Sequence, residues 1–143
     1  MKQADIVVAT SGIPQLILPQ QVREGQIILA LSNPRPEISP ADALARGAAF
    51  AADGESVNNI LGFPGILKGS LDSKARCINV EMYLAAAQAL VALTPPGELV
   101  PNPLDVSVHR KVAQAVARSA MDTRVARIQL DEDYFSSELV GRR

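Results

Sequence analysis

Two short apolar runs, each followed at once by small polar residues, constrain the fold of this 143-residue chain more than any other feature. Residues 6–9 lead into a Thr-Ser-Gly turn, and residues 26–32 end in Ser-Asn-Pro. Continuous aliphatic runs bounded by turn residues are typical of parallel strands that are buried on both faces. We therefore expect strands over residues 4–12 and 26–32, each of them central in a parallel sheet.

Helical patterns alternate with these strands. Residues 19–24 read as a short helical connector, and Ser39 followed by Pro40 reads as a helix start, with Ser39 as the N-cap. Gly47 ends that helix, and residues 48–52 form a third short strand. This alternation predicts an α/β fold, specifically the second half only of a Rossmann-like, doubly wound parallel sheet, followed by C-terminal helices.

The second half of the chain changes to a helical character. Glycines and a proline within residues 56–73 indicate a helix that packs closely or bends, and residues 79–93 and 108–120 show helical apolar spacing. The polar tail over residues 129–143 predicts a short helix or a frayed end. The two apolar stripes consist of Met82, Ala85, Ala86, Ala89, Leu90 and Leu93, and of Val108, Val112, Ala115, Val116, Ser119 and Ala120.

Composition excludes several classes of protein. Lys and Arg number 14 against 15 Asp and Glu, a balance that argues against nucleic acid or an anionic membrane as the main partner. No apolar run approaches the roughly 18 residues of a membrane span. A single cysteine, Cys77, excludes an intramolecular disulfide, fits a reducing compartment and is expected to be a small buried hydrophobe. With no signal-peptide pattern at the start, we expect a cytoplasmic globular chain.

Three polar clusters follow the apolar segments, where ligands of parallel sheets bind. The first is Thr10, Ser11 and Gly12, whose hydroxyls and N–H groups could meet a ligand or simply form a turn. The second contains Asn33, which could hydrogen-bond an amide or a ribose, or cap its own loop. The third places Asn58 and Asn59 at the head of an apolar helix, where they could receive a carboxylate or cap the helix.

Other polar residues are interpreted as structural or solvated. Arg35 and Glu37 read as solvated loop charges, and His109 has no partner at a suggestive spacing. The acidic run at residues 131–133 reads as a solvated face. The residues therefore predict neither a metal cluster nor a nucleophile with its base, and no catalytic residue is expected within this chain.

The polar clusters belong to an ordered series of stretches, above all Asn-Asn-Ile-Leu-Gly-Phe-Pro-Gly at residues 58–65. The series is similar to the malic enzymes, in the C-terminal part of their NAD(P)-binding domain. The resemblance covers residues 1–130 as a domain portion and leaves 131–143 as a polar C-terminal tail. The matching stretches are residues 4–12, 28–37, 57–72, 78–82, 100–105 and 125–128.

This resemblance implies an oxidoreductase that converts malate to pyruvate and carbon dioxide with NAD or NADP and a bound Mg²⁺ or Mn²⁺. It implies that Thr10, Ser11 and Gly12 line the cofactor cleft and that Asn58 lies beside the cofactor. Asn33 would contact the nicotinamide end and the substrate, and Asn59 would hydrogen-bond malate.

The family's catalytic Tyr and Lys, its acidic metal ligands and its glycine-rich phosphate turn have no counterpart in this sequence. We therefore expect a malic-enzyme part that is inactive alone and that associates with the missing portion or forms a homo-oligomer. The rival interpretation is a non-enzymatic half-domain, which pairs with itself or a partner chain through an open sheet edge and an apolar face.

Overall fold

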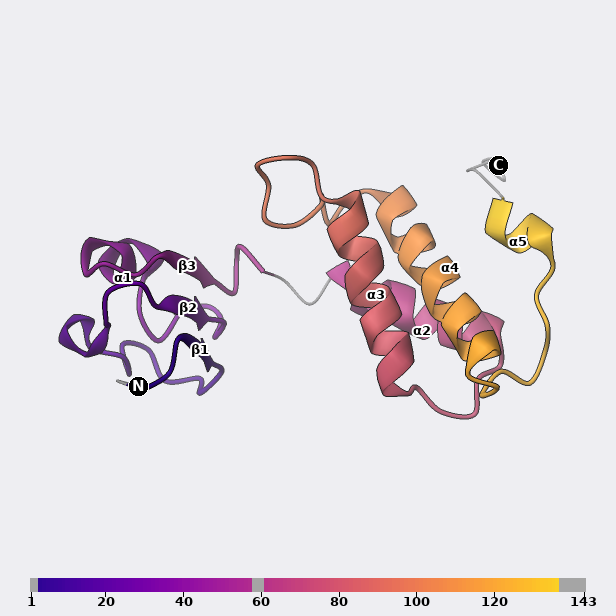
Figure 1. Ribbon diagram of the computed structural model, residues 1–143, viewed down its shortest axis with the longest axis horizontal. Coiled ribbons are helices and arrows are strands. Elements are labelled where there is room, and N and C mark those ends of the chain that lie inside the picture. Colours follow the sequence, from indigo (N-terminus) through magenta and orange to yellow (C-terminus); the bar gives the residue numbers. More distant parts are fainter. Residues whose placement is uncertain (1–2, 58–60, 137–143) are drawn as a thin grey trace. The chain divides into compact units, whose positions relative to one another are not determined.

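Three parallel strands form where the apolar runs predict them, although each is shorter than its run. The structure, a computed structural model, describes residues 3–57 and 61–136. Strands β1 (Ile6–Ala9), β2 (Ile27–Ala30) and β3 (Phe50–Asp53) pair in the order β1-β2-β3, as Figure 1 shows. The α/β fold class is therefore confirmed.

The connections between strands follow the expected turn and cap chemistry. A 3₁₀ turn, η1 (Pro19–Gln21), lies between β1 and β2, and helix α1 (Pro40–Ala45) lies between β2 and β3. The Ser39 side chain accepts a hydrogen bond from the Asp42 N–H at 3.1 Å, as an N-cap does. The predicted start of this helix is confirmed.

One face of the sheet carries the core of this part of the chain. Val7, Ile28 and Ala51 share a row of the ladder, and segments before and after the strands pack against that face. Burial of this face removes aliphatic surface from water and so fixes the strand register. The buried core residues here are Ile17, Ile28, Ala30, Ile38, Ala43 and Ala48.

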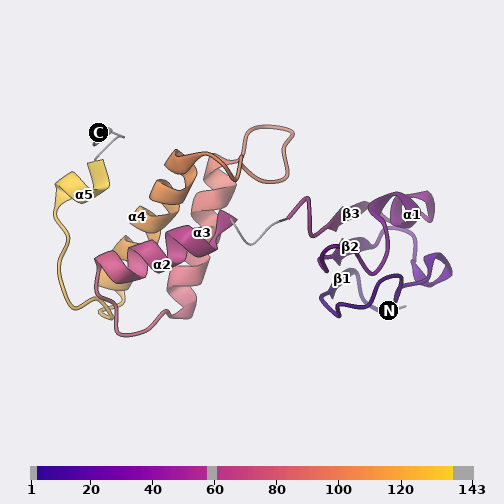
Figure 2. The same ribbon diagram turned by 180° about the vertical axis from the view of Figure 1, so that it is seen from behind.

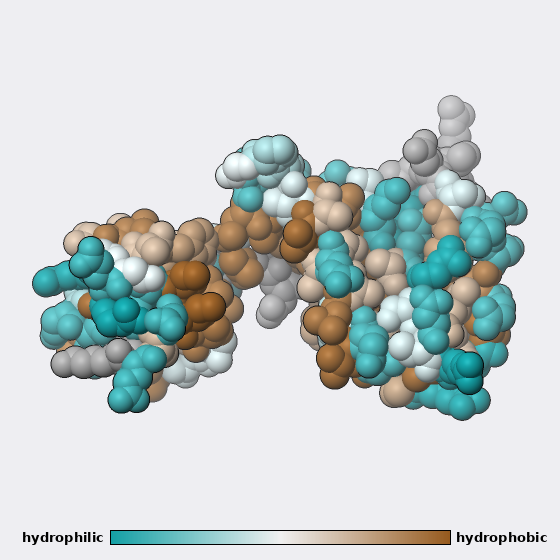
Figure 3. Space-filling view, in the orientation of Figure 1, coloured by the Kyte–Doolittle hydropathy of each residue, from teal (hydrophilic) through white to brown (hydrophobic). Residues whose placement is uncertain are grey.

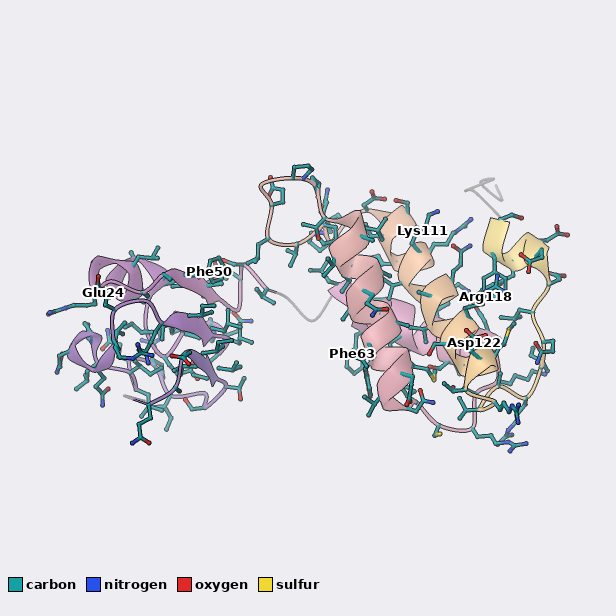
Figure 4. The ribbon with its side chains drawn as sticks, in the orientation of Figure 1. Glu24, Phe50, Phe63, Lys111, Arg118 and Asp122 are labelled. Atoms are coloured by element: carbon teal, nitrogen blue, oxygen red, sulfur yellow. The ribbon has the colours of Figure 1, made fainter. Side chains whose placement is uncertain are left out.

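The opposite face of the sheet is exposed along β1 and at the start of β3, whereas Ala52 on the same face is buried. Ile6 and Val8 are 57% and 60% exposed, and Phe50, labelled in Figure 4, is 36% exposed. Brown, hydrophobic surface on this unit is visible in Figure 3. β1 is also an edge strand of the described sheet. β1, which the apolar run predicts as a central strand, thus has an open edge and an exposed apolar face in this part of the sheet, as expected for a half-sheet.

The chain divides into two compact units, residues 1–58 and 59–143, and the second unit is helical. Its helices are α2 (Phe63–Asp72), α3 (Val80–Leu93), α4 (Val106–Asp122) and α5 (Glu132–Ser136), which Figure 2 shows from behind. The two predicted long helices are confirmed. The buried residues of α4 are Val108, Val112, Ala113, Val116, Ala117 and Ala120.

Two glycines let α2 and α4 approach closely. A Cβ atom on Gly65 would lie 2.5 Å from a methyl of Val112, and one on Gly69 would lie 2.4 Å from the carbonyl oxygen of Ala113. Side chains at these positions would overlap the neighbouring helix, so the glycine spacing sets the distance between the helices. The prediction of a closely packing helix is confirmed.

Asn79 begins α3 and also ties it to the end of α4. Its side-chain oxygen accepts from the Met82 N–H at 3.0 Å, and its Nδ2 donates to Thr123 Oγ1 at 2.9 Å. Asn79→Ala should therefore lower the free energy of unfolding by about 1–2 kcal/mol. Asn79→Asp keeps the cap but loses the donor to Thr123, so it should cost less than Asn79→Ala; urea denaturation of the three proteins measures both. Equal losses would contradict a capping role.

The C-terminal part of the described chain docks on the helices. Tyr134 in α5 donates its hydroxyl to Asp72 Oδ2 at 2.6 Å, and its carbonyl accepts from Gln114 Nε2 at 2.7 Å. The guanidinium of Arg118, labelled in Figure 4, lies 3.7 Å from the centre of the Phe135 ring. The expected short helix in the tail is confirmed.

Candidate functional site

The carboxyl ends of the three parallel strands form one rim. We define the strand-end rim as residues 10–12 after β1, 32–33 after β2 and 53–54 at the end of β3. Thr10, Ser11 and Gly12 are exposed there, and so is Asn33. The structure thus brings four of the predicted site residues to the edge where ligands of open α/β sheets bind. Asn58 and Asn59 lie outside the described residues.

A buried carboxylate lies beneath the rim. Glu37 is fully buried, and its Oε1 accepts hydrogen bonds from Ser11 N at 2.6 Å, Ser11 Oγ at 2.8 Å and Ser32 Oγ at 2.6 Å. Hydrogen bonds to a charged acceptor are stronger than neutral ones. The interpretation of Glu37 as a solvated loop charge was therefore wrong, because the fold directs its side chain inward between two loops.

Both serine hydroxyls extend this network to further backbone groups. Ser32 Oγ accepts from the Gly12 N–H at 2.9 Å, and Ser11 Oγ accepts from the Ile13 N–H at 3.1 Å. The N–H groups of residues 11–13 are consequently directed to protein acceptors. The expectation that Ser11 and Gly12 offer their N–H groups to a ligand does not hold in this arrangement.

The network also sets the protonation of Glu37. Burial alone would raise the pKa of this carboxyl, but the hydrogen bonds from Ser32 and Ser11 outweigh burial and lower the pKa from 4.5 to about 2. Glu37 is therefore an anion at neutral pH. Its charge is stabilised by hydrogen bonds, since no ion pair to Glu37 occurs within residues 3–57 and 61–136.

The lowered pKa of Glu37 predicts acid sensitivity. Because the folded pKa lies below the unfolded one, this group's stabilisation is complete above about pH 4.5 and is lost as the pH falls towards 2. Its loss should remove up to about 3 kcal/mol of unfolding free energy. Urea denaturation between pH 7 and pH 2.5 should show a smaller decline for Glu37→Gln than for the unmodified chain. Equal declines would assign the acid sensitivity to other carboxylates.

Gly54 fixes the position of Asn33 on the rim. Asn33 Nδ2 donates to the Gly54 carbonyl at 3.3 Å. A Cβ atom on Gly54 would lie 2.6 Å from the Leu31 carbonyl oxygen and 2.8 Å from Asn33 Nδ2. Only glycine leaves room for the asparagine side chain at this distance.

The end of β3 is closed by a tight turn. Asp53 Oδ1 accepts from the Ser56 N–H at 2.9 Å and from Ser56 Oγ at 2.8 Å. These bonds from Ser56 lower the pKa of Asp53. The turn holds the chain just before the Asn58-Asn59 pair.

Part of the rim borders a hollow at the ends of β2 and β3. A hollow of about 220 Å³ lies between the ends of β2 and β3, and Asn33 and Gly54 are among the residues that line it. Complete small-molecule pockets usually measure about 300–1,000 Å³. The hollow is therefore smaller than a complete small-molecule site.

The cysteine and histidine outside the rim show no arrangement typical of a catalytic or metal site in the described part of the chain. Cys77 is exposed, so the expectation of a buried hydrophobe was wrong. His109 Nε2 contacts the Pro103 carbonyl at 2.8 Å, which fits its structural interpretation. Within the described ranges no group of three or more His, Cys, Asp or Glu residues could hold a metal ion, and no helix is long and apolar enough to cross a membrane.

The chain is similar in sequence to known enzymes over most of its length. The NAD-dependent malic enzyme 1 of Bacillus subtilis (strain 168) is 58% identical over 121 residues, which are 85% of this chain and 28% of the relative. The NADP-dependent malic enzyme of Rhizobium meliloti (strain 1021) is 37% identical over 143 residues, covering 82% of this chain and 19% of the relative. The chain is homologous to part of the malic enzymes. No protein-family model matches it.

Solved malic enzyme structures agree with this homology. The malic enzyme of Pyrococcus horikoshii aligns with a TM-score of 0.80 and 38% identity, covering 92% of this chain and 33% of that protein. The Entamoeba histolytica malic enzyme aligns at 0.78 and 31% identity, covering 88% and 29%. The chain thus spans about a third or less of the malic enzymes it matches. The resemblance inferred from the sequence is confirmed.

The sequence did not predict the roles of two residues of the rim, Ser32 and Gly54, or of Glu37 beneath it. Glu37 and Ser32 form the buried network, and Gly54 makes room for Asn33. The one sequence feature that could have indicated burial of Glu37 is its neighbour Ile38, an aliphatic residue that is buried in the core. Ser32 and Gly54 follow strands, as many turn residues do, and have no such signal.

Proposed function

We propose that this chain is part of the NAD(P)-binding region of a malic enzyme. The reaction is the oxidation and decarboxylation of malate to pyruvate and carbon dioxide, with NAD⁺ or NADP⁺ accepting the hydride. The observation that carries the proposal is the 58% identity to an NAD-dependent malic enzyme over 85% of the chain. The exposed rim above a buried network supports it, because a cofactor contact needs accessible groups on a rigid base.

Within this proposal the rim residues have distinct roles. Thr10, Ser11 and Gly12 line the dinucleotide cleft, and Asn58 lies beside the cofactor. Asn33 contacts the nicotinamide end and the substrate, and Asn59 hydrogen-bonds the malate carboxylate or hydroxyl. Neutral amides can hold a carboxylate without adding another negative charge next to it.

The catalytic groups and the ligands of Mg²⁺ or Mn²⁺ come from outside this chain in this proposal. The isolated chain should therefore bind NAD⁺ or NADP⁺ but should not turn over malate. A malate-dependent NAD(P)H assay with MnCl₂ tests this, with the complete Bacillus subtilis enzyme as the positive control. Turnover by the isolated chain would place catalytic residues within it and overturn the proposal that it is inactive alone.

The proposal also includes a partner and a location. The chain associates with the remaining portion of a malic enzyme, or with copies of itself, in the cytoplasm. Co-expression with the residual two-thirds of a relative, followed by purification through a tag on one part only, tests the first association. Recovery of malate-dependent activity in the purified pair is the expected result.

A second candidate function is a non-enzymatic half-domain that self-associates. The exposed apolar face with Ile6, Val8 and Phe50 favours it, because such a face is usually covered by another protein surface. Sedimentation velocity over a range of concentrations should then show an oligomer. Val8→Lys should dissociate it, whereas Val91→Lys, at an exposed position of α3, should not. An oligomer that binds no nucleotide would favour this candidate.

A further inference from the structure

The loops after β1 and β2 are joined through side chains rather than through the sheet ladder. The backbone bond from Leu31 N to Ala9 O, at 2.8 Å, marks the end of the ladder between these strands in the described part of the chain. Beyond it the link runs through the carboxylate of Glu37, which contacts Ser11 on one loop and Ser32 on the other. The loops are also linked directly, because the Gly12 N–H donates to Ser32 Oγ, and Ser32 Oγ donates in turn to Glu37. Glu37 is therefore the shared acceptor of the network that joins both loops.

Glu37 is itself anchored to the core of the sheet unit. Its carbonyl accepts from the Ile17 N–H at 3.0 Å, and the preceding carbonyl, of Pro36, accepts from the Gln15 N–H at 3.3 Å. Ile17 and Ile38 are both buried. The backbone of Glu37 is therefore fixed by hydrogen bonds, and a fixed backbone allows its carboxylate to hold Ser11 and Ser32 in place.

The partners of Glu37 require an acceptor without a donor of its own. Oε1 receives the Ser11 N–H and two hydroxyls, and Oε2 faces the Ser32 N–H at 3.4 Å. A carboxylate only accepts hydrogen bonds, whereas the amide of glutamine would place an NH₂ group against one of these donors. A glutamine of the same size could keep its oxygen at the Oε1 position, but its bonds there would lack the charge of the carboxylate, and its NH₂ group would face the Ser32 N–H. It therefore cannot reproduce the whole network.

We propose that Glu37 is a positioning residue for the cofactor rim, which holds the Ser11-Gly12 loop and the Ser32-Asn33 loop in the geometry that binds a nicotinamide dinucleotide. This inference rests on the proposed function. Glu37 itself lies beneath the rim and does not contact the ligand. Its effect passes through Ser11 and Ser32 to the exposed groups beside them.

The test uses the full 143-residue chain, labelled with ¹⁵N, and the variants Glu37→Gln and Glu24→Gln. Glu24 is the matched control because it is an exposed glutamate of the same unit, away from the rim, and it is labelled in Figure 4. Amide hydrogen exchange reports whether the loops are held, and titration with NAD⁺ reports whether they bind. Because Glu37→Gln also lowers the overall stability, the exchange rates of the Ser11 and Gly12 amides should rise at least tenfold more than those of the β2 amides. The dissociation constant for NAD⁺ should rise at least tenfold, and Glu24→Gln should match the unmodified chain in both measurements.

Other outcomes overturn the proposal. Unchanged exchange at Ser11 and Gly12, or unchanged NAD⁺ affinity despite faster exchange, would show that Glu37 does not position the rim. An equal increase in exchange at Ser11, at Gly12 and throughout β2 would show a general contribution to stability only. If Glu37→Gln does not fold, Ser32→Ala keeps the carboxylate and should still speed exchange at Gly12 and weaken NAD⁺ binding severalfold; no change would again overturn the proposal.

Failure of the proposed function gives a different pattern. If the unmodified chain binds no NAD⁺, the cofactor role of the rim fails in this chain. The exchange measurements then still decide whether Glu37 holds the two loops, because they need no ligand. Local exchange changes would retain Glu37 as the residue that orders the rim, and their absence would remove it.

Discussion

Gly69→Ala should destabilise the helical unit by about 3 kcal/mol, near the upper end of what overpacking usually costs. The new methyl would lie 2.4 Å from the Ala113 carbonyl oxygen and 2.8 Å from Val116 Cβ, both on α4. Neither is the free end of a flexible side chain, so the two helices must move apart. The gain in helix propensity of about 1 kcal/mol from alanine cannot offset this loss of packing.

Gly62→Ala is the matched control for this substitution. It makes the same chemical change immediately before α2, where a Cβ atom would meet only Ile66 Cδ1 at 3.5 Å, an ordinary contact. Gly62 has helical dihedral angles, which alanine also adopts. The unfolding free energy of the Gly62→Ala variant should therefore differ from that of the unmodified chain by less than about 1 kcal/mol. Thermal and urea unfolding of both variants measure the difference. Equal stabilities would mean that α2 and α4 can separate without cost.

Gly54→Ala should disrupt the rim and weaken NAD⁺ binding by at least tenfold. The added methyl would overlap the Leu31 carbonyl oxygen and the amide group of Asn33, so the asparagine must leave its position. Strain of this kind costs about 1–3 kcal/mol. Titration of the chain with NAD⁺ and its unfolding in urea measure the two effects separately.

A double-mutant cycle shows whether Gly54→Ala acts through Asn33. Asn33→Ala removes the amide that the new methyl would meet, so the two substitutions should be less than additive in their effect on binding. Additive losses would show that Gly54 acts independently of Asn33, for example through the Leu31 carbonyl alone. Normal binding by Gly54→Ala would remove the glycine from the site.

Local sequence patterns predicted the elements that depend on neighbours in the chain. The cap at Ser39, the end of the first helix near Gly47 and the close packing of the glycine-bearing helix follow from residues a few positions apart. The same holds for the position of Asn33 after β2, because a strand followed by a turn brings its next residues to the sheet edge. The ordered stretches shared with malic enzymes likewise needed only the sequence.

Only the tertiary structure decided which side chains are buried and which side chains contact one another. Glu37 has the sequence context of a loop charge, and it becomes a buried anion because the fold brings Ser11, 26 positions earlier, beside Ser32. The apolar run of β1 looks like a strand covered on both sides, yet one face is exposed in the described sheet. Hydrophobic pattern fixes which residues can be covered, whereas coverage itself and the partners of a buried charge depend on contacts between segments far apart in the chain.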